Sequence, residues 1–153
     1  MILNQAKSTN SLSPKTVTEI FHAAKFCQQA FIRDDKAHLE SAVEQITVLV
    51  ERGLAHTPLL TLCTLNLCHS RYGYLTNLIV KISVLTSLFA RQMDVNQTAA
   101  RSLVKCNLLT IYGIAKLLVQ IQKQPEQLTK CKKVLKSCHL VAFKKLKAAN
   151  VKD

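Results

Sequence analysis

The sequence contains few of the residues that end helices or form tight turns. It has only three glycines and three prolines, and no tryptophan, in 153 residues, whereas 48% of the residues are apolar. Sheet proteins need more turn residues than this, so the composition predicts an all-helical, all-α fold. The apolar content also argues against a disordered chain, and the length suffices for one domain with its own core.

Acidic residues are scarce in the second half of the chain. Residues 1–70 carry six Lys/Arg and six Asp/Glu, whereas residues 71–153 carry fifteen Lys/Arg and three Asp/Glu. The whole net charge of +12 therefore falls in the second half. Such asymmetry indicates either an anionic partner or a charged surface that keeps the protein soluble.

Signals for secretion and membrane insertion are also lacking. No charged-then-apolar leader opens the chain, and the longest apolar stretch, residues 75–90, is interrupted by Lys81 and two serines, so no membrane span is expected. The six cysteines form no C-x-x-C pair, which favours reduced and mostly buried thiols in a cytoplasmic protein. A weaker alternative is a zinc site drawn from Cys63, Cys68, His69, Cys138 and His139, whose spacing matches no common zinc module.

Apolar residues recur at helical spacing through most of the chain. Residues 1–12 are predicted to form a flexible N-terminus and residues 13–153 one domain, a single compact bundle of five to seven helices. Asn96 and Thr129 are predicted helix starts, and Gly53 is a predicted helix end. The predicted helical segments are residues 13–33, 39–53, 57–69, 75–93, 96–121 and 129–149.

The spacing also predicts which side chains face the core. A break in the helix is expected around Gly113, between two apolar runs. The predicted inward stripe of residues 75–93 consists of Leu75, Leu78, Ile82, Leu85 and Phe89. That of the following helix consists of Ala99, Leu103, Cys106 and Leu109.

The last predicted helix, residues 129–149, has two distinct faces. Its inward face is predicted to contain Cys131, Leu135, Cys138, Ala142, Leu146 and Ala149. The opposite face carries Lys130, Lys133, Lys136, Lys144 and Lys147. These lysines are interpreted first as the solvated side of a packed helix, and alternatively as a surface for nucleic acid, acidic protein or anionic lipid. Only Phe143 lies among them to stack on a base, which gives little support for single-strand recognition.

Three short segments share an order with a known family. They are LLTIYG at residues 108–113, MDVN at residues 93–96 and KQPEQLT at residues 123–129. They are similar to the L-L-H-D-I-G, L-G-L-S and N-K-P-G-K-L-T elements of the HD domain in HD-GYP cyclic di-GMP phosphodiesterases. The chain therefore resembles a degenerate member of that family, and the resemblance implies an HD-domain-like bundle that ends before any G-Y-P segment.

The metal ligands of that family are replaced in this chain. The His-Asp pair falls on Thr110 and Ile111, the first histidine on Leu78, and the later His-Pro element near Cys138 and His139. A hydrolytic metal needs several His and carboxylate ligands, which these side chains do not supply. The resemblance thus implies no catalytic residue, no metal and no cofactor. Leu78, Thr110 and Ile111 are expected to converge and to fill a former polar cavity.

The expected function is that of a non-catalytic HD-GYP-like helical module. Such a module would act as a protein-interaction or regulatory domain in bacterial signalling, with another protein as its partner. One alternative is a nucleic-acid-associated protein that uses the Lys-rich C-terminal helix. The other alternative is a divergent metal-dependent phosphohydrolase, which would need an unusual ligand set.

Overall fold

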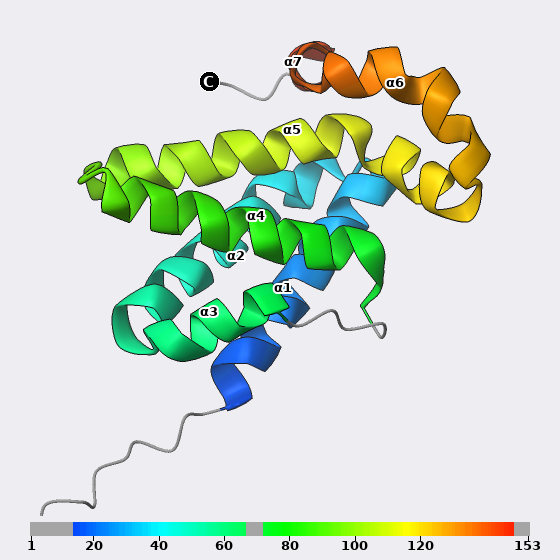
Figure 1. The fold of residues 1–153 in the computed structure, drawn as a ribbon. Helices are drawn as coiled ribbons and strands as arrows, with labels where there is room; N and C mark the ends of the chain where they lie inside the picture. The colour runs from blue at the N-terminus through cyan, green and yellow to red at the C-terminus, as the bar shows by residue number, and fades with distance from the viewer. Residues whose placement is uncertain (1–13, 67–71, 149–153) are drawn as a thin grey trace, which may run out of the picture.

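The computed structural model describes residues 14–66 and 72–148 of the chain. Within these ranges the chain forms seven α-helices and one 3-10 turn, with no strand (Figure 1). The elements are α1 (Pro14–Arg33), α2 (Lys36–His56), α3 (Pro58–Asn66), α4 (Gly73–Gln92), α5 (Gln97–Lys123), η1 (Pro125–Gln127), α6 (Leu128–Lys136) and α7 (Cys138–Ala148). The prediction of an all-helical bundle of five to seven helices is confirmed. The predicted flexible N-terminus, residues 1–12, lies outside the described residues.

Four long helices, α1, α2, α4 and α5, build the core. α4 packs along α5, α1 packs along α2, and α1 also crosses α4 (Figure 1). α3 closes one side of the bundle against α2 and α4, while α7 packs against α5 on the other side. Burial of one large apolar side chain stabilises a fold by about 1.5–3 kcal/mol. Because these helices supply most of the buried side chains, their packing is the main source of stability. The largest fully buried side chains include Tyr112, Phe21, Phe31, Ile20, Leu39 and Ile46.

Side-chain caps explain two of the helix boundaries. Asn96 caps α5 as predicted, because its side-chain oxygen accepts a hydrogen bond from the Ala99 N–H at 2.9 Å. The predicted end of α2 at Gly53 is wrong, since α2 continues to His56. Thr57 ends α2 instead: its N–H and its hydroxyl both donate to the Gly53 carbonyl, at 2.7 and 3.2 Å.

The inward face of α4 differs from the prediction. Leu75 is buried and Leu78 and Ile82 are half-buried, but Leu85 and Phe89 are exposed. Small and hydroxyl side chains take the buried positions further along the helix. The Ser83 and Ser87 hydroxyls donate to carbonyls one turn earlier in α4, at 2.8 Å each, so they are satisfied in the core. The full set of buried residues on α4 is Leu75, Thr76, Ile79, Val80, Ser83, Val84, Ser87 and Ala90.

The inward face of α5 is also rotated relative to the prediction. Leu103 and Cys106 are exposed, whereas Ala99 and Leu109 are half-buried. The side chains that enter the core are Val104, Leu108, Ile111, Tyr112 and Ala115. At 100° per residue, the observed stripe is centred on nearly the opposite side of the helix from the predicted one, a difference of roughly 180°.

Gly113 has a packing role and does not interrupt the helix. α5 is continuous from Gln97 to Lys123, so the predicted break is not observed. A Cβ atom at Gly113 would lie 2.6 Å from both Cα and Cβ of Ala142, and 2.7 Å from its N. The glycine therefore allows α7 to approach α5 more closely than any side chain would permit.

The prediction of one continuous C-terminal helix is wrong. The chain is divided at Ser137, whose N–H donates to the Lys133 and Val134 carbonyls and whose hydroxyl donates to the Lys133 carbonyl. The predicted start at Thr129 is also wrong, since α6 begins at Leu128, directly after the 3-10 turn. Of the predicted inward face only Ala142 is buried, while Cys131, Leu135, Cys138 and Leu146 are half-buried, and Ala149 lies outside the described residues.

Gly113→Val should lower the free energy of unfolding by about 1–3 kcal/mol, because an added side chain overpacks the contact with α7. Urea denaturation measures this loss. Cys106→Val, at an exposed position of the same helix, controls for valine in a helix and should change little. Ala142→Gly should not rescue Gly113→Val, because the backbone N and Cα of residue 142 still obstruct the new Cβ. Parent-like stability of Gly113→Val would contradict the described approach of α7.

Candidate functional site

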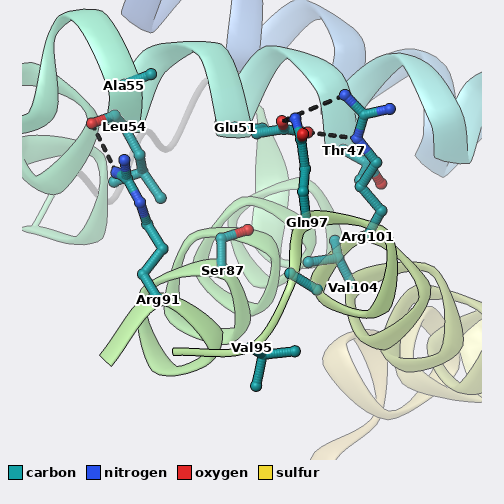
Figure 2. Close-up of a pocket in the computed structure, with 11 residues that line it drawn as sticks. Thr47, Glu51, Leu54, Ala55, Ser87, Arg91, Val95, Gln97, Arg101 and Val104 are labelled. Atoms are coloured by element: carbon teal, nitrogen blue, oxygen red, sulfur yellow. Dashed lines mark hydrogen bonds and ion pairs between the residues drawn. The ribbon is translucent and has the colours of Figure 1, made fainter. Parts of the chain in front are cut away.

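A pocket of about 340 Å³ lies between α2, α4 and the beginning of α5 (Figure 2). Its size is within the range of small-molecule sites. It is lined by Thr47, Glu51, Leu54 and Ala55 from α2, by Ser87 and Arg91 from α4, and by Val95, Gln97, Ala100, Arg101 and Val104 from the α4–α5 connection and α5.

The α4–α5 connection brings two arginines to opposite sides of this pocket. Asp94 adopts a positive φ of 52°, and the Val95 N–H donates to the Ala90 carbonyl at 2.9 Å. This tight reversal lets α5 start beside the end of α4. Arg91 at the end of α4 and Arg101 in the second turn of α5 then flank the pocket (Figure 2).

The two arginines have different partners. Arg101 donates to the Glu51 carboxylate from Nε at 2.6 Å and from Nη2 at 3.2 Å, and the Gln97 side-chain amide donates to the same carboxylate. The hydrogen bond from Arg101, more than any other contact, lowers the pKa of Glu51, so Glu51 is ionised at neutral pH. Arg91 instead donates from Nη1 to the Leu54 carbonyl at 2.8 Å. The pocket therefore holds two positive charges and one negative charge.

The pocket provides binding groups but no acid–base pair. Its lining contains no histidine or cysteine, and its one carboxylate is held by Arg101 and Gln97. The Thr47 and Ser87 hydroxyls already donate to main-chain carbonyls, at 2.7 and 2.8 Å. General acid–base catalysis needs a positioned group that can exchange a proton. The lining side chains therefore suit binding better than catalysis. Sequence patterns did not indicate this pocket, because its residues come from three segments far apart in the chain.

A second polar cluster connects the α1–α2 junction to α5 and α7. The Tyr112 hydroxyl donates a hydrogen bond to the Asp34 carboxylate at 2.7 Å. The ammonium groups of Lys116 and Lys145 lie 3.1 and 2.8 Å from the oxygens of the same carboxylate. The Lys145 ammonium also lies 4.0 Å from the centre of the Tyr112 ring. These contacts tie three parts of the fold together around one carboxylate.

The environment of this cluster shifts the pKa of Asp34 and of Tyr112 in opposite directions. Partial burial by itself would raise the pKa of Asp34, but the hydrogen bonds from Lys145, Tyr112 and Lys116 outweigh it and hold that pKa well below its usual range. Burial, together with the hydrogen bond to Asp34, raises the pKa of Tyr112. Asp34 is therefore charged and Tyr112 protonated near neutral pH, which suits a structural role.

The positions that resemble the HD metal ligands lie on α4, α5 and α7. Ile111 is buried in the core, and Leu78 packs against the same core from α4. Thr110 is half-buried, and its hydroxyl donates to the Cys106 carbonyl at 3.0 Å. At the start of α7, Cys138 is half-buried and His139 is exposed.

The five cysteines within the described residues do not follow the predicted pattern of mostly buried thiols. Cys27 is buried, and burial raises its pKa. Cys63 and Cys106 are exposed, and Cys131 and Cys138 are half-buried. Across residues 14–66 and 72–148, no three His, Cys, Asp or Glu side chains gather in a group that could hold a metal ion. Two residues of the alternative zinc set, Cys68 and His69, lie outside those ranges.

The lysine-rich face predicted for the last helix is divided between two helices. All five of its lysines are exposed, and none forms an ion pair with a described acidic residue. Lys145, which the prediction did not include, is the lysine of α7 that pairs with Asp34. The members on α6 are Lys130, Lys133 and Lys136, and those on α7 are Lys144 and Lys147.

Large apolar side chains are exposed on the outer side of α4 and α5. Leu85, Phe89 and Met93 are 54%, 65% and 62% exposed, and Leu103 of α5 is 43% exposed. The first three are four residues apart and therefore share one side of α4. These four residues are termed the α4–α5 face. Residues 82–90, which include Leu85 and Phe89, and residues 106–115 contain no charged side chain, whereas charged residues lie near Met93 and Leu103 in the sequence.

By length and composition, α4 and α5 could each cross a membrane. Their most apolar windows have mean hydropathies of 1.4 and 1.5, and 44% and 28% of those windows are buried inside the bundle. The core helices of soluble proteins meet the same criterion, so hydropathy does not distinguish the two cases.

Comparisons of the chain with protein-family models, with curated proteins and with solved structures give no match. The functional assignment therefore depends on the surfaces and sites described above.

Asp34→Asn should lower the free energy of unfolding by about 1 kcal/mol at neutral pH, because it removes the charge from two partly exposed ion pairs. Asn still tolerates the positive φ of 57° at this position. Because the pKa of Asp34 is lower in the folded state than in the unfolded state, its charge stabilises the fold fully above the ordinary pKa of aspartate, about 3.9. This stabilisation is lost as the pH falls below that value. The stability difference between parent and variant should therefore shrink as urea titrations are repeated below about pH 4.

Asp94→Asn is the matched control for this prediction. Asp94 has a similar positive φ of 52° but no ion pair with another described residue. Asp94→Asn should therefore change stability little. A difference between parent and Asp34→Asn that stays constant down to about pH 2 would show that the charge of Asp34 is not the stabilising element.

Proposed function

We propose that this chain is a non-catalytic, HD-GYP-like helical module that binds a partner protein through the α4–α5 face. The observation that carries this proposal is the exposure of the apolar side chains of Leu85, Phe89, Met93 and Leu103 on two helices that pack against each other. Contiguous apolar patches on a soluble protein mark interaction sites. Side chains four residues apart on one helix suit a partner that packs as a helix.

Charge favours a foreign acidic helix over a second copy of this chain. The chain has a net charge of +12, and all of that excess lies in the half that contains α4 and α5. Two copies would repel each other, whereas an acidic partner would be attracted and its association accelerated. The proposed partner is therefore an amphipathic helix with an apolar side and acidic flanks.

The side chains at three of the HD-like positions, Leu78, Thr110 and Ile111, support the non-catalytic part of the proposal. Leu78 and Ile111 are apolar and pack in or against the core, and the Thr110 hydroxyl is engaged with a main-chain carbonyl. None of them supplies the ligands that a hydrolytic metal needs. The HD-GYP resemblance, the cytoplasmic location and the role in bacterial signalling stay predictions from the sequence.

A designed acidic helix tests the proposal directly. A peptide of about 20 residues, with leucines on one side and glutamates on the other, should bind the parent protein in a fluorescence anisotropy titration. Its lysine-for-glutamate counterpart should bind more weakly. Phe89→Ser should weaken binding of the acidic peptide about tenfold or more, because burial of a phenylalanine contributes about 1.5–3 kcal/mol.

Leu59→Ser is the matched control, since Leu59 is an equally exposed apolar residue on α3, outside the α4–α5 face. It should leave peptide binding unchanged. Equal loss in both variants, or no peptide binding by the parent, would overturn the proposal. Sedimentation that shows a parent dimer dissociated by Phe89→Ser would identify a second copy, and not a foreign helix, as the occupant.

Binding of nucleic acid is a second candidate function, favoured by five exposed lysines on α6 and α7 that have no ion pair in the described part of the chain. The triple change of Lys133, Lys136 and Lys144 to Gln should then weaken binding and flatten its salt dependence. The melting temperature should hardly change, because exposed charges contribute under about 1 kcal/mol. A parent protein without salt-sensitive binding to duplex or single-stranded nucleic acid in a shift assay excludes this candidate.

A further inference from the structure

We propose that the pocket between α2, α4 and α5 binds a small organic acid, with the carboxylate on Arg91 and the apolar part on Leu54, Val95 and Val104. This site is separate from the α4–α5 face and does not depend on the function proposed for that face. Figure 2 shows Arg91 at one side of the pocket, and Glu51, Gln97 and Arg101 at the other.

The apolar part of the pocket determines what kind of ligand body it accepts. Leu54, Ala55, Val95, Ala100 and Val104 supply aliphatic surface, and no aromatic side chain is among the lining residues. A nucleotide base would find no ring to stack on. The volume of about 340 Å³ is near the lower limit for ligand pockets, which favours a short aliphatic chain.

The charges at the two sides of the pocket determine where an anionic group would lie. Arg101 has its charge matched by Glu51, in a two-point contact at 2.6 and 3.2 Å. Arg91 has no carboxylate partner among the described residues and uses one of its five N–H donors on the Leu54 carbonyl. The net charge of Arg91, Arg101 and Glu51 is +1, so one further negative charge would neutralise the site.

A carboxylate fits this position better than other anions. A guanidinium presents parallel N–H donors that match the two oxygens of a carboxylate. The positive end of α5, a helix of 27 residues, begins beside the pocket and adds to the attraction for an anion. The Ser87 oxygen lies in the lining between the two sides and can accept a further hydrogen bond, since its own proton is donated to the Ser83 carbonyl.

Hexanoate and 1-hexanol provide a matched pair of probes, because they share an apolar chain and differ in the charged group. Both are titrated at pH 7 into the full chain, up to about 50 mM, with backbone amide shifts as the readout. We expect saturable hexanoate binding, with the largest shifts at Ala55, Val95 and Ala100. Hexanoate should bind about tenfold more tightly than 1-hexanol, because only the carboxylate of hexanoate forms a charge-assisted hydrogen bond with Arg91.

Arg91→Gln should reduce hexanoate affinity about tenfold and leave 1-hexanol affinity unchanged. Arg52→Gln is its control: it removes the same charge from α2, at a residue that does not line this pocket. It should change neither affinity. Arg91 and Arg52 are both exposed, so both variants are expected to fold as the parent does.

Ala100→Leu provides an independent test, because a larger side chain fills the cavity and should abolish binding of both probes. Three results would overturn the proposal: no saturable hexanoate binding by the parent, shifts centred on the α4–α5 face, or equal hexanoate affinities for the parent and Arg91→Gln. The peptide titration concerns other residues, so loss of one proposal leaves the other intact.

Discussion

The packing of α4 through its small side chains is the constraint on which the candidate sites depend. Ser83, Ser87 and Ala90 face the core, and the two hydroxyls are satisfied within the helix itself. These residues bring little bulk into the interior, so the larger Leu85 and Phe89 lie on the outer side. The small side chains on the inner side of α4 also leave space beside Ser87, where the pocket is found. One helix orientation thus accounts for both the α4–α5 face and the pocket.

The attachment of α7 to α5 depends on a close backbone contact and on one carboxylate. Gly113 allows Ala142 to approach within a distance that no Cβ would permit. Lys145 then reaches both Asp34 and the ring of Tyr112. α6 buries no residue completely, so most of the anchoring at this end falls to α7. Short-range packing and a charge network therefore replace the long amphipathic interface that the sequence pattern predicts.

Helical periodicity in this sequence predicted the elements well and their orientation poorly. The Asn96 cap and the helix over residues 14–33 were found because capping and apolar spacing are local properties. α4 has apolar residues on two overlapping stripes, one with Leu78, Ile82 and Leu85 and one with Ile79, Val80 and Val84. Spacing cannot choose between such stripes, since the choice depends on what packs against the helix. The break at Ser137 likewise has no glycine or proline to signal it.

The pocket could not be predicted for a related reason. Arg91 and Arg101 lie ten residues apart across a helix reversal, and Glu51 is 40 residues away from Arg91. Their arrangement follows from the way α2 packs against α4 and α5, which local sequence does not encode. The reversal between α4 and α5 depends on the positive φ of Asp94. The only sequence signal for it is that Asp adopts a positive φ more readily than most residues.

The interior at Ile111 shows what a carboxylate metal ligand would cost at this position of the core. Ile111 belongs to the central core together with Leu108 and Tyr112. A carboxylate at that position would be buried without a metal or a basic partner, which costs several kcal/mol or forces protonation. A protein of this size is stabilised by only about 5–15 kcal/mol in total. Stability therefore favours an apolar residue there, whatever the ancestry of the fold, and functions that use the surface and the pocket are compatible with that core.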